Sequence, residues 1–159
     1  MHSVLLLALG IGFVAGLRSM TAPALVCWAA HLQWIHLQGT PLGFMASPIA
    51  VGIFTLAAIA ELVADKLPKT PARTAAGPLI GRIVMGALCG ACLYAAAAAT
   101  PIVGAVIGAI GAVCGTFAGY YIRRALVNGL KVKDVIIAVA EDIIAICLAY
   151  SIVHSVISY

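Results

Sequence analysis

Three carboxylic acids lie inside long apolar stretches of this chain. Glu61 comes four residues before the pair Asp65-Lys66, at the end of one stretch, and Glu141-Asp142 lie within the last one. A carboxyl group surrounded by hydrocarbon is costly unless it is paired, protonated or turned toward water, so acids in such places mark functional sites by default. Their chemistry is the binding of a cation or a proton.

Arg18 is the cation predicted to accompany these acids. It interrupts the first apolar stretch and is followed by Ser19, Thr21 and Pro23. Irregular backbone at membrane depth is tolerated only where it is buried in protein or lines water. The pattern predicts an interrupted transmembrane helix. A simple proline kink is the alternative, and both interpretations place Arg18 inside the helix bundle.

The predicted site for an ion or a small substrate therefore combines acids with one arginine, and polar neighbours support it. The binding residues are Glu61, Asp65, Glu141, Asp142 and Arg18, and the supporting residues are Lys66, Arg82, Ser19 and Thr21.

No cofactor, catalytic group or metal cluster is predicted. His31 and His36 miss the i,i+4 spacing of a helical metal pair, and Cys89-Gly-Ala-Cys92 has no basic neighbour that would activate a thiol. We expect these cysteines to be small core residues. Since no nucleophile–base pair or phosphate loop is found, we expect no enzyme. The low aromatic content of 7% argues against nucleic-acid binding.

Composition places these residues in a membrane. The chain has 159 residues, of which 64% are hydrophobic and 9% charged, whereas soluble domains have about 25% charged residues. Mean hydropathy is +1.16. At roughly 20 residues per span, about five helices fill the whole length. The prediction is one all-α integral membrane domain over residues 1–159.

The spans follow from where the apolar stretches begin and end. They are predicted at about residues 4–28, 48–64, 79–99, 102–121 and 135–155. The first is interpreted as a retained span, because no Lys or Arg precedes it as in a signal peptide. Residues 29–45 contain no Lys, Arg, Asp or Glu and follow Trp28, so they are predicted to lie at the membrane–water interface. One version of this prediction is a short helix that lies in the membrane plane.

Lys and Arg residues give the orientation. Eight of the nine lie in or beside the connections after the second and fourth spans. Positive residues favour the cytoplasmic side. We therefore expect a cytoplasmic N-terminus and a C-terminus outside.

Glycine spacing in the fourth span predicts close packing. Gly104 and Gly108 form one stripe, and Gly111, Gly115 and Gly119 form another. Small residues let helix backbones approach closely. This helix is predicted to be central and packed on two sides. Since five spans barely enclose a pathway, we also expect a homodimer.

Two parts of the chain resemble each other. Residues 58–65 match residues 138–145 in an Ala-β-branched-Ala-Glu core, and a glycine-rich span ending in Arg18 or Arg123 precedes each. One span lies between the two copies, so they would be inverted two-helix repeats flanking a central span. Inverted repeats with a site at their interface are typical of transporters. Glu61 and Glu141 would then be equivalent positions.

The motifs Ala15-Gly16-Leu17-Arg18-Ser19, Glu61 with Ala64-Asp65-Lys66-Leu67-Pro68, and Gly81-Arg82 resemble a bacterial multi-pass membrane family catalogued as domain of unknown function 4126. The resemblance covers essentially the whole chain and implies the architecture rather than an activity. After Pro68 this chain has a basic stretch where many members of the family have acids.

Three functions remain open at this level. The first is a secondary transporter or an ion or proton pathway that uses the intramembrane carboxylates. The second is a structural or assembly subunit whose charges are paired inside the bundle, for example Arg18 with Glu61 or Arg82 with Asp142. The third is a lipid-handling protein resembling a flippase or scramblase, with basic loops that hold anionic headgroups.

Overall fold

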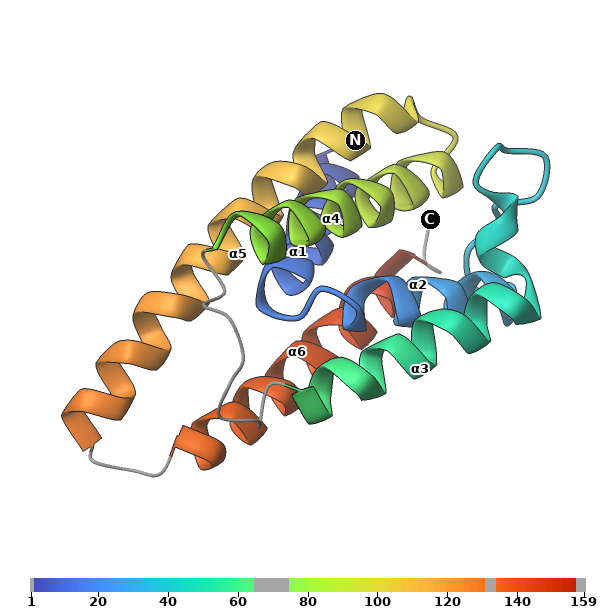
Figure 1. Ribbon diagram of the computed structural model, residues 1–159. Helices are drawn as coiled ribbons and strands as arrows, with labels where there is room; N and C mark the ends of the chain where they lie inside the picture. The colour runs from blue at the N-terminus through green and yellow to red at the C-terminus, as the bar shows by residue number, and fades with distance from the viewer. Residues whose placement is uncertain (1, 65–74, 131–133, 157–159) are drawn as a thin grey trace.

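The computed structural model describes residues 2–64, 75–130 and 134–156 of the chain, and this part is helical with turns and no strands (Figure 1). The elements are α1 (His2–Leu17), α2 (Thr21–His31), the 3-10 helix η1 (Gly43–Ala46), α3 (Pro48–Ala64), α4 (Ala76–Ala96), α5 (Pro101–Leu130) and α6 (Asp134–Val156). The predicted all-α class is confirmed. Asp65, Lys66, Lys131 and Lys133 lie outside the described residues.

Among the described residues, three helical segments are long and apolar enough to cross a membrane: Ala76–Ala96, Pro101–Val127 and Ile136–Val156. Ser3–Leu17 and Pro48–Ala64 are shorter apolar helices. At 1.5 Å per residue, α3 is about 26 Å long, close to the ~30 Å of a hydrocarbon core. The membrane character is therefore supported, and the number of five spans stays a prediction.

The predicted first span is indeed interrupted, since α1 ends at Leu17 and α2 begins at Thr21. The second span matches α3, at residues 48–64. The fourth predicted span lies within α5, but this helix continues past it to Leu130. Arg123 and Arg124 therefore lie on a helix and not in a loop. The reason is local: from Ile122 to Val127 the sequence has no proline or glycine to stop the helix.

The in-plane helix considered for residues 29–45 is not formed. α2 ends at His31, Gln33 has a φ of 60°, and Gly39 has a φ of 80°. Positive φ values end a helix. Ile35 and Leu37 are buried in the apolar core, so this segment folds back onto the bundle.

The helices form two groups that α1 and α2 connect. α1, α4 and α5 pack against one another, while α2 contacts α3 and α6. Contacts between α1 and α6 and between α2 and α4 join the groups. In Figure 1 the long α5 runs beside α4, and α3 lies beside α2. The break between α1 and α2 therefore lies where the two groups meet.

Glycines bring α5 against two neighbours, as their spacing predicts. A Cβ at Gly104 would lie on the backbone of Gly90 in α4, and a Cβ at Gly115 would lie on the Phe13 carbonyl in α1. Gly108 contacts α4 through Gly86, and its carbonyl lies against Gly12 of α1. Side chains at these positions would separate the backbones, so glycine is required for this approach.

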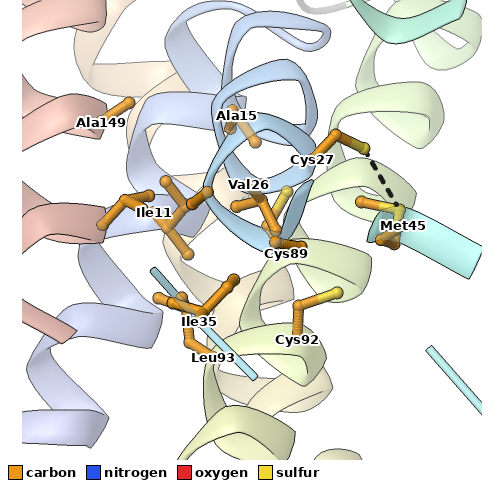
Figure 2. Close-up of a cluster of buried hydrophobic side chains, with 14 of the residues drawn as sticks. Ile11, Ala15, Val26, Cys27, Ile35, Met45, Cys89, Cys92, Leu93 and Ala149 are labelled. Atoms are coloured by element: carbon orange, nitrogen blue, oxygen red, sulfur yellow. Dashed lines mark hydrogen bonds between the residues drawn. The ribbon is translucent and has the colours of Figure 1, made fainter. Parts of the chain in front are cut away.

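The apolar core lies around α2 and joins both groups (Figure 2). Ile11, Val26 and Leu93 are fully buried in it, together with Cys89 and Cys92. Cys27 Sγ lies 3.7 Å from the sulfur of Met45. The positions of Cys89 and Cys92 agree with their interpretation as small core residues.

Candidate functional site

The interruption between α1 and α2 has a local cause. Pro23 cannot donate a backbone hydrogen bond, and its ring excludes the carbonyl of the residue four positions earlier, here Ser19. A helix can begin with proline in its first turn but cannot run through it. α1 accordingly makes its last bond from Arg18 N to the Val14 carbonyl, and α2 begins with Ala24 N bonded to the Met20 carbonyl. Residues 18–20 form what we call the helix break.

Glu61 of α3 accepts the hydrogen bonds that the helix break offers. The backbone N–H of Ser19 donates to Oε1 at 2.9 Å, and the Ser19 hydroxyl donates to the same oxygen at 2.8 Å. The backbone N–H of Met20 donates to Oε2 at 2.8 Å. A negative charge is also favoured at this end of α2, since the N-terminus of a helix is partly positive. Glu61 thus caps α2 from another helix.

The carbonyl of Gly16 is the matching acceptor on the other side of the break. Arg82 Nη1 of α4 donates to it at 2.9 Å, and the Thr116 hydroxyl of α5 lies 3.2 Å from it. Thr116 also lies 2.8 Å from the carbonyl of Ala112, one turn earlier on its own helix. An unsatisfied carbonyl at this depth would cost several kcal/mol, on the order expected in hydrocarbon. These side chains remove that cost.

Arg18 forms a buried ion pair with Asp142 of α6 at the break. The side chain of Arg18 is fully buried, and that of Asp142 is 9% exposed. Removing two charges from water is expensive, and only close pairing offsets it. The prediction that Arg18 lies inside the bundle agrees with this burial.

A second ion pair lies next to the first. Arg123 Nη1 of α5 is 3.7 Å from Glu141 Oε2 of α6, and both side chains are largely covered. Since Glu141 and Asp142 are adjacent, α6 directs one acid toward α1 and the other toward α5. These two acids therefore have different partners, although they are neighbours in the sequence.

The structure brings most of the predicted site residues to one place. Arg18, Ser19, Glu61, Arg82 and Asp142 all lie at or around the helix break, and Thr21 is buried where α2 begins. Glu141 is adjacent through its pairing with Arg123. Asp65 and Lys66 lie outside the described residues. Within the described part of the chain, no group of three His, Cys, Asp or Glu residues could hold a metal ion.

Two participants were missed by sequence reasoning. Thr116 carried a usable signal, because it is the lone Ser or Thr in the glycine-rich stretch of residues 101–121. The Gly16 carbonyl carried none, since every residue has such a group and only the break leaves this one without its helical partner.

Taken together, the break joins a hydrogen-bonded carboxylate, a buried ion pair and two further donors, which come from the break itself and from α3, α4, α5 and α6. It offers no nucleophile activated by a base within the described residues.

Comparison with known proteins gives a family and nothing narrower. No curated protein and no solved structure matches the chain. The family model described as "Domain of unknown function (DUF4126)" matches residues 5–157, nearly the whole length. Arg18, Ser19, Glu61 and Arg82 lie at the break and belong to the motifs that suggested this resemblance from the sequence. The chain therefore belongs to the DUF4126 family.

Proposed function

We propose that this protein is a small secondary transporter or an ion or proton pathway of the membrane, and not an enzyme. The observation that carries the proposal is the buried Arg18–Asp142 ion pair beside a broken helix. Ionisable residues inside membrane helices commonly mark ion pathways and proton relays. Broken helices commonly form the binding sites of secondary transporters.

The Arg18–Asp142 pair suits the coupling of ion binding to helix packing, because the pair exists only while Asp142 is ionised. A proton or a cation that neutralises Asp142 competes with Arg18 for the same carboxylate. Releasing the contact would loosen α6 from the end of α1, where the two helix groups meet. The neutralisation of one acid would then change how the groups pack.

An arrangement of contacts supports the inverted-repeat hypothesis. In the first half, the acid of α3, Glu61, bonds to residues 19–20, directly after Arg18. In the second half, the acid of α6, Glu141, pairs with Arg123 of α5. In both halves the acid thus contacts residues at or just after the arginine that ends the preceding glycine-rich stretch, which is Arg18 in the first half and Arg123 in the second. Asp142 joins the two halves by pairing with Arg18.

The test is flux into liposomes that contain the purified protein and a trapped pH dye, under gradients of Na⁺, K⁺, Mg²⁺, Ca²⁺ and Mn²⁺. Wild type is compared with Asp142→Asn, which removes the charge and keeps the shape. Ser151→Ala is the control, because the Ser151 hydroxyl bonds only within α6, to the Cys147 carbonyl at 2.8 Å. Cation-dependent flux lost in Asp142→Asn and kept in Ser151→Ala supports the proposal.

A structural or assembly role is the second candidate, and one observation favours it. Glu61 and the Gly16 carbonyl each receive hydrogen bonds from elsewhere in the chain, as holding a broken helix together requires. The absence of flux from wild type under every gradient would favour this role and overturn the transport proposal.

The topology and assembly belong to the same proposal. We place the protein in a bacterial inner membrane as about five spans, with the N-terminus cytoplasmic and the C-terminus outside. We also propose a homodimer. Many large apolar side chains face outward from α3, α5 and α6, including Leu56, Ile102 and Ile143. Such a surface suits lipid or a second copy.

A further inference from the structure

A pocket of about 420 Å³ lies between α1, α5 and α6, next to the helix break but separate from it. Its volume is within the roughly 300–1,000 Å³ of ordinary ligand sites. α5 and α6 both pack on α1 but contact each other little, which leaves the space open. Its lining residues are Phe13, Leu17, Gly119, Ile122, Arg123, Leu126, Ile136, Ile137, Ala140, Glu141, Ile144 and Leu148.

The lining is apolar except at one place. Arg123 and Glu141 are the charged side chains of the wall, and they form the ion pair described above. An apolar cavity offers water no hydrogen-bond partners and is filled by apolar ligands instead. Ligand sites of this kind combine apolar walls with a few polar groups that fix orientation. The occupant should therefore be long, apolar and charged or polar at one end.

The pocket opens on the apolar outer surface of the bundle. Leu126, Ile136, Ile144 and Leu148 line it and are also 37–59% exposed on the outer surface of the bundle. They belong to α5 and α6, whose apolar segments are long enough to span a bilayer. A lipid chain can enter from that side without crossing water. A water-soluble ligand would meet only hydrocarbon there.

The charge near the pocket selects the headgroup. Arg123 lies in the wall, and Arg124 follows it on an exposed part of α5. Against these two cations the lining provides one acid, Glu141. Arginine binds carboxylates and phosphates through paired N–H groups. An anion at this position can share Arg123 with Glu141. A cationic group would have to compete with the arginines for Glu141.

We propose that this pocket binds the acyl chain of an anionic lipid, with its phosphate or carboxylate at Arg123. The source of that chemistry is an anionic phospholipid or a free fatty acid. The inference does not rest on the proposed transport activity, because the Arg18–Asp142 pair is not part of the lining. Lipid binding and ion flux can thus succeed or fail independently.

The first experiment is native mass spectrometry of the full chain in detergent, with phosphatidylglycerol, phosphatidylcholine or oleate added separately. We expect retention of one phosphatidylglycerol or one oleate, and weaker retention of phosphatidylcholine. Retention of phosphatidylglycerol identifies the phospholipid source, and retention of oleate alone identifies the fatty-acid source. Equal retention of phosphatidylglycerol and phosphatidylcholine would contradict the headgroup assignment.

Two variants locate the site. Ala140→Phe fills the pocket and should weaken retention about tenfold, the loss expected when roughly two methylene groups remain unburied. Val139→Phe is the matched control, because Val139 is the preceding residue of α6, is exposed and is not in the lining. Equal lipid retention by the two variants would overturn the proposal.

A second measurement does not depend on how the variants fold. Wild type is incubated with phosphatidylglycerol that carries a photoreactive group on its acyl chain, and crosslinked peptides are mapped. We expect crosslinks on residues 119–126 and 136–148, competed by excess unlabelled lipid. Crosslinks spread evenly over the apolar surface, including the exposed Ile49, Ile53 and Leu56 of α3, would indicate ordinary bilayer contact and overturn the proposal.

Discussion

The hydroxyl of Ser19 donates a hydrogen bond of 2.8 Å to the carboxylate of Glu61, which also accepts the backbone N–H groups of Ser19 and Met20. This contact connects α3 to the break between α1 and α2. Glu61 therefore satisfies backbone groups that a continuous helix would satisfy internally. An acid whose position suggests ion binding has, in this structure, a stabilising contact as well.

Glu61→Gln should lower the free energy of unfolding by about 1–3 kcal/mol. The glutamine amide keeps one acceptor oxygen and places an NH₂ group against a backbone N–H. Ser19→Ala removes only the hydroxyl and should cost less, about 0.5–1.5 kcal/mol. Thermal unfolding in detergent measures both. Wild-type stability in Glu61→Gln would show that the cap contributes nothing.

Arg18 and Asp142 should be strongly coupled. Asp142→Asn alone removes the negative charge beside a buried arginine and should cost about 3–5 kcal/mol. Arg18→Gln combined with Asp142→Asn should cost less than the sum of the two single changes, because neither charge then remains. A double-mutant cycle on thermal unfolding measures the difference. Additive effects would mean that the pair is not formed in the folded protein.

Glycine at position 108 should be irreplaceable. Gly108→Ala places a Cβ against the Gly86 carbonyl and should destabilise the bundle by about 1–3 kcal/mol through overpacking. Gly81→Ala in α4 is the control, because a Cβ there meets nothing within 4 Å. The control should be neutral or slightly stabilising, since alanine favours helix more than glycine does. Similar melting temperatures for both variants would contradict the predicted close packing of α4 and α5.

The proposed orientation predicts the behaviour of fusions to alkaline phosphatase, which is active only outside the cytoplasm. A fusion after Tyr159 should be active, and a fusion after Lys69 should be inactive. A fluorescent protein that matures only in the cytoplasm should give the opposite pattern at the same positions. Activity at Lys69 would contradict the orientation, and inactivity at Tyr159 would contradict an odd number of spans.

Several elements could be predicted because their causes are local. Hydropathy marked the α3 boundaries at Pro48 and Ala64, and Pro23 with its polar neighbours marked the break. The glycine spacing in α5 predicted its two close neighbours. α5 continues beyond the predicted span to Leu130, because helix propensity does not stop at the charged residues Arg123 and Arg124. The segment after His31 was predicted incorrectly, because burial of Ile35 and Leu37 depends on the rest of the bundle.

The sequence by itself determined the membrane class, the apolar helices, the break and the acids and arginines near it. Tertiary structure alone decided which charge meets which: Arg18 with Asp142, Arg123 with Glu141, and Glu61 with the backbone at Ser19 and Met20. Hydropathy and helix propensity act over a few neighbouring residues. The partner of a charged side chain depends on how each helix is rotated and how closely it approaches its neighbours, and contacts such as those of the α5 glycines set both.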